Sequence, residues 1–358
     1  MPGGLPKKTS RALLDIEDNT VVPVIRNPRK VNEETEAVFY FPGCGSERLF
    51  GQVGLATQAM LYEIGTITVL PPGYLCCGYP QTAAGQEDKG SQITTDNRVL
   101  FHRVANTLNY LDIKTVIVSC GTCMDQLLKY QFEKIFPGCR LLDNHEYLLE
   151  KGVKLQGVKG THLLHESLMN PSGSEQQATA LPAPALRDAA SVGPLHERHL
   201  GSTDIEQTAT ALPAPALRDA ASVRYMYHDP CHSPMKTYAP LKVVNELMAT
   251  PVALNDRCCG EAGTFGLSVP QIATQVRFRK EEEMRKGAEA LRRDGFTGEI
   301  KILTSCPACQ QGLSRYTDDA GTTTDYIVVE MAKHLLGASW LEDYVANANN
   351  GGIERVLL

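Results

Sequence analysis

The chain has 358 residues, 42% of them hydrophobic and 21% charged, and its formal net charge is -6. This composition is typical of a globular protein with room for two or three domains. No large basic excess indicates a nucleic-acid partner, and no run of about 18 apolar residues indicates a membrane span. The N-terminal segment lacks the apolar stretch of a secretory signal, so we expect a cytoplasmic protein with reduced thiols.

The first half of the chain reads as alternating strands and helices. An apolar, aromatic-rich strand at 37–41 runs into Cys44, and a long helical stretch follows at 95–111. A β-branched strand at 114–118 leads into a Ser-Cys-x-x-Cys motif, then a short helix and a strand at 140–144. Strands that alternate with helices predict parallel pairing through crossover connections.

The second half repeats this order. A strand at 224–228 runs into Cys231, and a long helical stretch covers 272–294. A strand at 299–304 leads into a second Ser-Cys-x-x-Cys motif, followed by a short helix and a strand at 325–330. Because a repeated unit indicates duplication, we predict an α/β fold of two homologous modules. Each has a small parallel sheet, and a pseudo-twofold axis relates the two.

A low-complexity segment separates the modules. The sequence ATALPAPALRDAASV occurs at 178–192 and again at 209–223. It contains too few large apolar groups to offset the entropy of ordering, so we predict a disordered linker. The predicted division is an N-terminal extension at 1–35, a first module at 36–160, the linker at 161–223, a second module at 224–345 and a C-terminal tail at 346–358.

Ten of the eleven cysteines form two sets with one pattern, and Cys139 stands alone. Each set has a single cysteine, a vicinal pair followed by glycine, and a Cys-x-x-Cys motif. The single cysteine and the pair are separated by 31 and 26 residues, and the pair and the last motif by 42 and 46. The first set is Cys44, Cys76, Cys77, Cys120 and Cys123, and the second is Cys231, Cys258, Cys259, Cys306 and Cys309.

Three kinds of site are compatible with such a set. A Cys-x-x-Cys motif alone is typical of a thioredoxin-like redox pair, and four thiolates complete a structural zinc site. Five thiolates exceed the zinc requirement and favour an iron–sulfur cluster. Two adjacent thiolates can flank several irons but suit a single tetrahedral ion poorly. We therefore favour iron–sulfur chemistry, and zinc in one or both modules is the alternative.

The sequence around the cysteines suggests how they are supported. Cys120 and Cys306 follow strands and precede helices, where free backbone N–H groups and the helix dipole stabilise thiolates. His228 and His232 flank Cys231 and are candidates to donate hydrogen bonds to the ligands or to bind the metal. Packing is the simpler interpretation of His228, and the two interpretations of His232 are balanced. No residue is assigned a catalytic role.

The doubled order of Cys, Cys-Cys-Gly and Cys-x-x-Cys resembles the CCG-domain, or cysteine-rich domain, proteins. These include the cysteine-rich subunit of heterodisulfide reductase, the iron–sulfur subunit of glycolate oxidase and lactate-utilisation iron–sulfur proteins. Residues 13–30 and 349–358 are also similar to the C-terminal region of fused FAD-linked oxidases. The resemblance implies an iron–sulfur cluster in each five-cysteine set, two [4Fe-4S] clusters in all, of the noncubane type found in heterodisulfide reductase.

The resemblance predicts an iron–sulfur electron-transfer protein or domain of a flavin-dependent 2-hydroxyacid oxidoreductase, of the glycolate or lactate type. The chain has no flavin or nucleotide-binding fingerprint, so we expect FAD on a partner subunit or an upstream domain. The electron acceptor, a quinone or another carrier, stays open, as does a peripheral position at the inner face of the membrane. The alternatives are disulfide reduction at a cluster, as in heterodisulfide reductase, and a zinc-stabilised scaffold.

Overall fold

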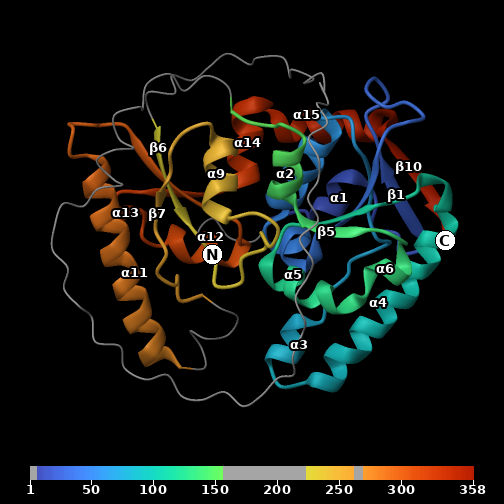
Figure 1. Ribbon diagram of the computed structural model, residues 1–358, viewed down its shortest axis with the longest axis horizontal. Helices are drawn as coiled ribbons and strands as arrows, with labels where there is room; N and C mark the ends of the chain where they lie inside the picture. Colours follow the sequence, from blue (N-terminus) through green and yellow to red (C-terminus); the bar gives the residue numbers. More distant parts are fainter. Residues whose placement is uncertain (1–5, 156–222, 262–268) are drawn as a thin grey trace, which may run out of the picture. The chain divides into compact units, whose positions relative to one another are not determined.

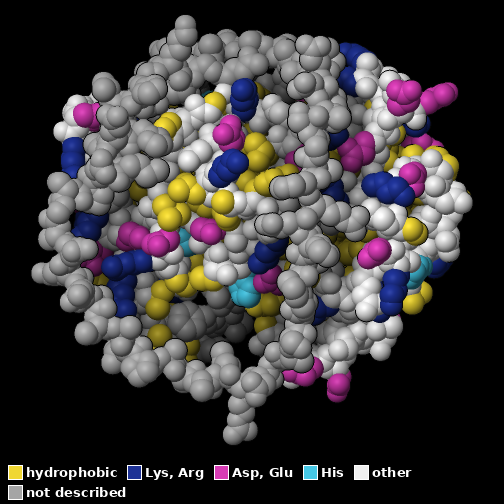
Figure 2. Space-filling model, viewed as in Figure 1, with side chains coloured by type: hydrophobic (Ala, Val, Ile, Leu, Met, Phe, Trp, Pro, Cys, Tyr) yellow, Lys and Arg dark blue, Asp and Glu magenta, His cyan; other side chains and the backbone are white. Residues whose placement is uncertain are grey.

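The computed structural model describes residues 6–155, 223–261 and 269–358 (Figure 1). The predicted linker at 161–223 lies outside these residues, except for Val223, which begins a strand. Within the described ranges, no helix combines the length and the apolar character that a membrane crossing requires. On the face shown in Figure 2, lysine and arginine side chains are interspersed with aspartate and glutamate.

The first sheet has six strands in the order β10-β1-β3-β2-β4-β5. Its part β3-β2-β4-β5 is parallel, as predicted, whereas β1 pairs antiparallel with both β3 and β10. Every residue of β1 and β2 is buried, as in strands whose two faces are both covered. The strands are β1 (Val21–Ile25), β2 (Ala37–Phe41), β3 (Ile67–Val69), β4 (Thr115–Val118), β5 (Arg140–Asp143) and β10 (Ile353–Leu357).

Helices connect the strands of the first sheet. The predicted helix at 95–111 is α4, which begins earlier than expected, at Glu87. Asp143 closes a capping box with Glu146 and so starts α7 directly after β5. The helices are α1 (Ser10–Leu14), α2 (Gly51–Glu63), α3 (Tyr79–Ala83), α4 (Glu87–Thr107), α5 (Gly121–Leu127), α6 (Phe132–Ile135) and α7 (Asn144–Glu150), with shorter helical turns η1 (Gly45–Leu49), η2 (Asn109–Leu111) and η3 (Leu128–Tyr130).

The second sheet has four parallel strands in the order β7-β6-β8-β9. This order repeats β3-β2-β4-β5, so the strand before the single cysteine again lies between the strands before the two other motifs. The protein therefore contains two homologous α/β modules. The elements are β6 (Val223–His228), α9 (Pro240–Met248), β7 (Ala253–Leu254), α11 (Pro270–Leu291), β8 (Glu299–Thr304), α12 (Pro307–Ser314), α13 (Thr317–Ala320), β9 (Thr323–Tyr326), α14 (Ile327–Leu335), α15 (Trp340–Asn347) and η5 (Ala348–Gly352).

The two ends of the chain differ from the prediction. The expected extension at 1–35 contains β1, and the expected tail at 346–358 contains β10. These strands pair with each other from Val21 opposite Leu357 to Ile25 opposite Ile353. A single five-residue strand has no partner in its own neighbourhood of the sequence, so the local pattern could not reveal this pairing. Both segments belong to the first sheet, and the predicted module boundaries exclude them.

The strand predicted at 325–330 is wrong from residue 327 onward. β9 ends at Tyr326, and Ile327 begins α14. Ile327, Val328 and Val329 are fully buried, and α14 packs on α2. The β-branched run favours a strand locally, but burial of a helix face against α2 outweighs that preference.

The two modules pack against each other through helices and through one buried hydroxyl group. α14 lies against α2 (Figure 1), and α9 lies against α7. The hydroxyl of Tyr326 shares its single hydrogen between the carbonyl oxygens of Ser119 and Ser305, which lie 2.7 and 3.0 Å away. These serines immediately precede Cys120 and Cys306, so one side chain links the Cys-x-x-Cys segments of both modules.

Glu146 forms a second link between the modules and gives a testable prediction. Its Oε1 accepts from the backbone N–H groups of Thr237 and Tyr238 at 2.7 and 2.9 Å, and Oε2 accepts from Asp143 N. Because Glu146 is fully buried, Glu146→Ala leaves these donors without a partner. We expect a loss of about 2 kcal/mol in the free energy of unfolding, measured by urea denaturation.

The control for this prediction is Glu63→Ala. Glu63 pairs with Lys30 within the first module, where both side chains are about a third exposed. Surface pairs of this kind contribute less than about 1 kcal/mol. Equal losses in the two variants would contradict a specific role of Glu146 between the modules.

Candidate metal centres

The first cysteine set lies at the carboxyl ends of β2, β3 and β4. Cys44 follows β2 and caps η1, and the pair Cys76-Cys77 lies in the loop after β3. Cys120 follows β4 and is the N-cap residue of α5, which contains Cys123. The carboxyl ends of parallel strands are the usual binding edge of an open α/β sheet. The fold therefore brings all five cysteines to this edge.

The five thiols of the first set interact in one continuous order. Cys44 contacts Cys76, Cys76 contacts Cys77, Cys77 contacts Cys123, and Cys123 contacts Cys120. Hydrogen bonds from Cys44 and Cys77 lower the pKa of Cys76 to about 3. The hydrogen bond from Cys123 lowers the pKa of Cys120 to about 6. Cys76 and Cys120 are thus stabilised as thiolates, the form that binds metals, while hydrogen bonding and burial raise the pKa values of Cys44, Cys77 and Cys123.

The second set occupies the same edge of the second sheet. Cys231 follows β6, the pair Cys258-Cys259 follows β7, and Cys306 is the N-cap residue of α12, which contains Cys309. Pro307 stands at the first helical position, where its missing N–H costs nothing.

The thiols of the second set interact in the same order as those of the first. The order of contacts is Cys231, Cys258, Cys259, Cys309 and Cys306. The Sγ atoms of Cys259 and Cys309 lie 3.3 Å apart. Hydrogen bonds from Cys258 and Cys309 lower the pKa of Cys259. Two segments far apart in the sequence thus build the same five-thiol arrangement.

The glycine after each vicinal pair has a steric reason. Gly78 and Gly260 have φ angles of 89° and 74°, a region that side chains rarely adopt. Their N–H groups point back to the preceding pair, with Gly78 N 3.4 Å from Cys76 Sγ and Gly260 N 3.4 Å from Cys258 Sγ. The Cys-Cys-Gly motif is therefore one turn that directs a backbone donor to a thiol.

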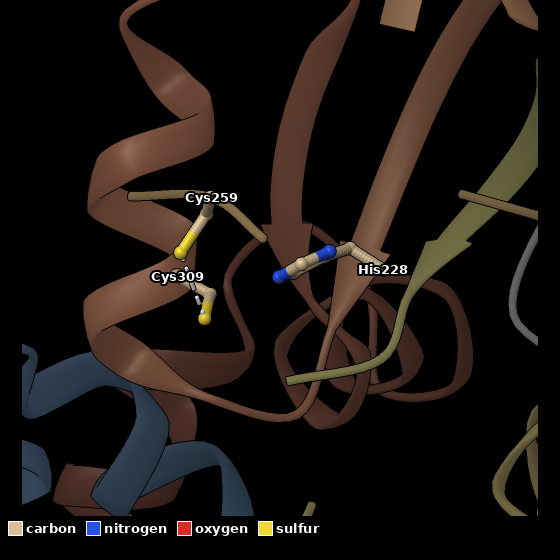
Figure 3. A group of neighbouring side chains, drawn as sticks. All are labelled: His228, Cys259 and Cys309. Carbon is tan, nitrogen blue, oxygen red and sulfur yellow. Dashed lines mark hydrogen bonds between the residues drawn. The ribbon is translucent and has the colours of Figure 1, made fainter. Parts of the chain in front are cut away.

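His228 and His232, the two histidines of the prediction, lie in different places. His228 is buried, and its imidazole forms a compact group with Cys259 and Cys309 (Figure 3). Its ligand nitrogen and the two sulfur atoms all lie within 4.8 Å of one another. His228 therefore lies beside two of the predicted ligands of the second set.

His232 joins the two modules beside the cysteine sets. Its Nδ1 lies 2.5 Å from Oδ2 of Asp125, and its Nε2 lies 3.3 Å from the hydroxyl of Tyr79. Both partners belong to the first module. A side chain at Gly121 would collide with the carbonyl oxygen of His232, so this close approach requires glycine there. His232 therefore fixes the loop after Cys231 against the start of α5.

Sequence reasoning missed several polar residues around the thiols. In the first module, Asn97 donates to the carbonyl of Cys76 and the Tyr130 hydroxyl donates to the carbonyl of Cys77, at 2.7 and 2.9 Å. In the second, Lys280 is fully buried and lies near Cys259. Asn97 and Lys280 lie on the long helices α4 and α11 and Tyr130 ends the short turn η3, and nothing in the local pattern distinguishes these positions from their neighbours.

One contact near the thiols could have been predicted, because the residues that form it are repeated in both modules. A tyrosine stands four residues before each single cysteine, Tyr40 and Tyr227, and a serine precedes each Cys-x-x-Cys motif. The Tyr40 hydroxyl lies 2.7 Å from Ser119 Oγ, and the Tyr227 hydroxyl lies 3.3 Å from Ser305 Oγ. These paired contacts join the strand before the single cysteine to the strand before the last motif.

A cavity of about 450 Å³ opens beside the second set. It is lined by Arg257, Cys258, Val276 and Arg279. Both arginines are exposed, and Cys258 is half-buried. A small anionic molecule could therefore approach the thiol of Cys258 between two guanidinium groups.

The donor atoms fit a soft metal or an iron–sulfur cluster. Thiolates are the ligands of zinc and of iron–sulfur clusters, and five converge in each set. Cys77, Cys123, Cys259 and Cys309 are buried, while the other members are half-buried or, in the case of Cys231, exposed. Each set is thus anchored in the protein interior and reaches the surface at one side.

The chain is similar to three curated proteins. An uncharacterised iron–sulfur protein of Methanococcus maripaludis is 20% identical over 337 residues, covering 91% of this chain and 50% of that protein. One subunit of the fumarate reductase (CoM/CoB) of Methanothermobacter marburgensis is 22% identical, covering 86% of this chain and 46% of that subunit. A probable glycolate oxidase iron–sulfur subunit of Bacillus subtilis is 23% identical, covering 84% and 54%.

The chain spans about half the length of these curated relatives. No solved structure matches it significantly. A domain of unknown function, DUF3400, matches residues 314–358, and the cysteine-rich domain called CCG matches residues 38–128 and 225–314. Because the two CCG matches together span just over half of the chain, the protein belongs to the family with the cysteine-rich CCG domain.

Proposed function

We propose that the chain binds an iron–sulfur cluster at each five-cysteine set and acts as the electron-transfer subunit or domain of an oxidoreductase. The main support for the proposal is that both five-cysteine sets are complete and that their thiols contact one another in the same order. The names of the similar proteins support it, because all three describe iron–sulfur proteins or subunits of redox enzymes. The need for reduced thiols favours the cytoplasm, and a peripheral position at the membrane is compatible with the proposal.

In this proposal the ligands are the ten cysteines of the two sets. When bound, an iron–sulfur cluster takes up and releases single electrons. The protein holds the ligands at the ends of strands, and the N–H groups of Gly78 and Gly260 donate to ligand sulfur atoms. Burial and such hydrogen bonds set the potential at which the electron is held.

We further propose that the electrons come from FAD on a partner subunit or an upstream domain. The substrate class favoured is a 2-hydroxyacid of the glycolate or lactate type, since a glycolate oxidase iron–sulfur subunit is among the similar proteins. The substrate then binds to the partner, and this chain passes electrons to a quinone or another carrier.

A second candidate function is disulfide reduction at the second set. The cavity beside Cys258 favours it, because a substrate must reach the metal centre for such a reaction. Arg257 and Arg279 would attract a disulfide that carries carboxylate or phosphate groups. Reduction of a mixed disulfide by the isolated protein with an artificial electron donor would support this candidate over simple electron transfer.

The experiment that tests the proposed function is metal analysis after anaerobic purification. We expect about four irons with matching sulfide per set, and an EPR signal that appears or disappears on reduction. Zinc without sulfide would contradict the proposal and leave the zinc-stabilised scaffold. Electron transfer is then measured by mixing the protein with the reduced flavin partner and following oxidation of the flavin.

A further inference from the structure

His228 is held in the orientation of a metal ligand. It is the last residue of β6 and is fully buried. Its Nδ1 lies 3.2 Å from the carbonyl oxygen of Asn255, to which an N–H at this position donates. A histidine that binds a metal with one ring nitrogen commonly donates from the other nitrogen to a backbone carbonyl. The bond to Asn255 therefore leaves Nε2 as the nitrogen with a free lone pair.

Nε2 of His228 faces the thiol of Cys259, with which the side chain interacts, and it meets no nitrogen or oxygen partner among the described residues. Figure 3 shows this end of the imidazole directed toward Cys259 and Cys309. Within the described part of the chain, the only polar groups that Nε2 meets are therefore thiols, which are weak hydrogen-bond partners. A metal held by Cys259 and Cys309 would be within reach of this nitrogen, because the three ligand atoms all lie within 4.8 Å of one another.

The orientation of the imidazole is reinforced from its far side. The carbonyl oxygen of Asn255 also accepts a hydrogen bond from the buried Nζ of Lys280, at 2.8 Å. Lys280 is held in turn by Glu283, with Nζ 3.1 Å from Oε2. The carbonyl that aligns His228 is thus fixed by a helix, α11, rather than by a loop alone.

Among the described residues, the first set has no equivalent donor. In strand register, His228 lies opposite Thr304, two residues before Cys306, and Phe41 lies opposite Val118, two residues before Cys120. Phe41 therefore occupies the position of His228 in the first module, where its ring packs 6.0 Å from that of Phe101. The two sets share their cysteines but differ in this one side chain.

We propose that Nε2 of His228 binds the metal of the second set directly, together with Cys259 and Cys309. The inference rests on the proposed function in that it takes iron as the metal. The second centre then has mixed sulfur and nitrogen ligation, whereas the first has sulfur alone.

The test uses protein labelled with ¹⁵N-histidine, loaded anaerobically with iron and sulfide and then reduced. Pulsed EPR is expected to detect the hyperfine coupling of a histidine nitrogen bound directly to the metal. This coupling should differ between unlabelled protein and protein labelled with ¹⁵N-histidine. His228→Phe, which copies the first module, and His228→Gln, which keeps a polar side chain, are both expected to lose this coupling and keep their iron. His102→Phe, on α4 of the first module, is the matched control and is expected to retain it.

Two outcomes overturn the inference without touching the proposed function. In the first, iron and sulfide bind normally but no histidine coupling is detected. In the second, the coupling persists in both His228 variants. If neither iron nor sulfide binds, the proposed function fails, and Co(II) titration of the metal-free protein tests His228 by itself. The cobalt absorption bands are then expected to shift between wild type and His228→Phe but not between wild type and His102→Phe. Identical spectra in all three proteins overturn the inference.

Discussion

Replacing Cys259 with serine is expected to remove iron and sulfide from the second set and leave the first set loaded. Cys259 stands in the middle of its order of contacts, between Cys258 and Cys309, and only 3% of it is exposed. A serine hydroxyl does not ionise at neutral pH and is a hard donor, so it replaces a thiolate ligand poorly. Purified Cys259→Ser should contain about half of the wild-type iron and sulfide.

Two further variants make this result specific. Cys77→Ser changes the corresponding buried thiol of the first set and should remove the other half of the iron. Cys139→Ser is the matched control, because this half-buried cysteine belongs to neither set. In Cys76→Ser and Cys259→Ser, electron transfer from the partner flavin should be lost while reduction of that flavin by its substrate continues. Wild-type iron content in both Cys259→Ser and Cys77→Ser would contradict the ligand assignment.

Replacing Glu330 with glutamine is expected to cost about 3 kcal/mol of unfolding free energy at pH 7. Glu330 lies on α14 with 1% exposure. Burial alone raises its pKa, but hydrogen bonds from His334 and Lys301, with the charge of Lys301, lower the pKa from 4.5 to about 2. The Oε2–Nζ distance to Lys301 is 2.7 Å, and the Tyr225 hydroxyl donates to Oε1 at 3.0 Å.

The depressed pKa fixes the pH dependence of this effect. The folded state binds the proton of Glu330 more weakly than the unfolded state, so the stabilisation is fully present above pH 4.5. It is lost as the pH falls from 4.5 toward 2. Urea denaturation of wild type and Glu330→Gln between pH 7 and pH 3 should show the difference shrinking as the solution becomes acidic.

The control for the Glu330 prediction is Glu354→Gln. Glu354 pairs with Arg26 where both side chains are more than 40% exposed, so its contribution is below about 1 kcal/mol. A Glu330→Gln variant whose stability differs from wild type by the same amount at pH 7 and pH 3 would show that the charge of Glu330 does not stabilise the fold.

The cysteine sets could be predicted because their information is local and repeated. Each Cys-x-x-Cys motif follows a β-branched strand, and a strand that ends at a helix start has only a few possible geometries. Cys120 and Cys306 do cap helices as expected. The parallel centre of each sheet follows from the same alternation of strands and helices. The sequence also predicted which cysteine would stand outside the pattern, Cys139.

The rest depends on contacts between distant residues. From the sequence, Tyr326 is predicted only as part of a strand. Its hydroxyl lies between Ser119 and Ser305 because the two modules pack together. His228 looks like other histidines at strand ends until Cys259 and Cys309 are brought beside it. β1 and β10 pair across almost the whole chain, which no local pattern can indicate. Long-range pairing and burial, rather than intrinsic preference, decided each of these features.

The pairing of β1 with β10 has a consequence for how the protein folds. Residues 21–25 are synthesised more than three hundred residues before their antiparallel partner, residues 353–357. Contacts of such high sequence separation form slowly, and an apolar strand that waits for its partner is exposed to aggregation. Before β10 is synthesised, β1 can pair only with β3, and its other edge is unpaired. The sheet that holds the first cysteines of the chain is therefore the last to be completed, after every strand of the second sheet has been synthesised.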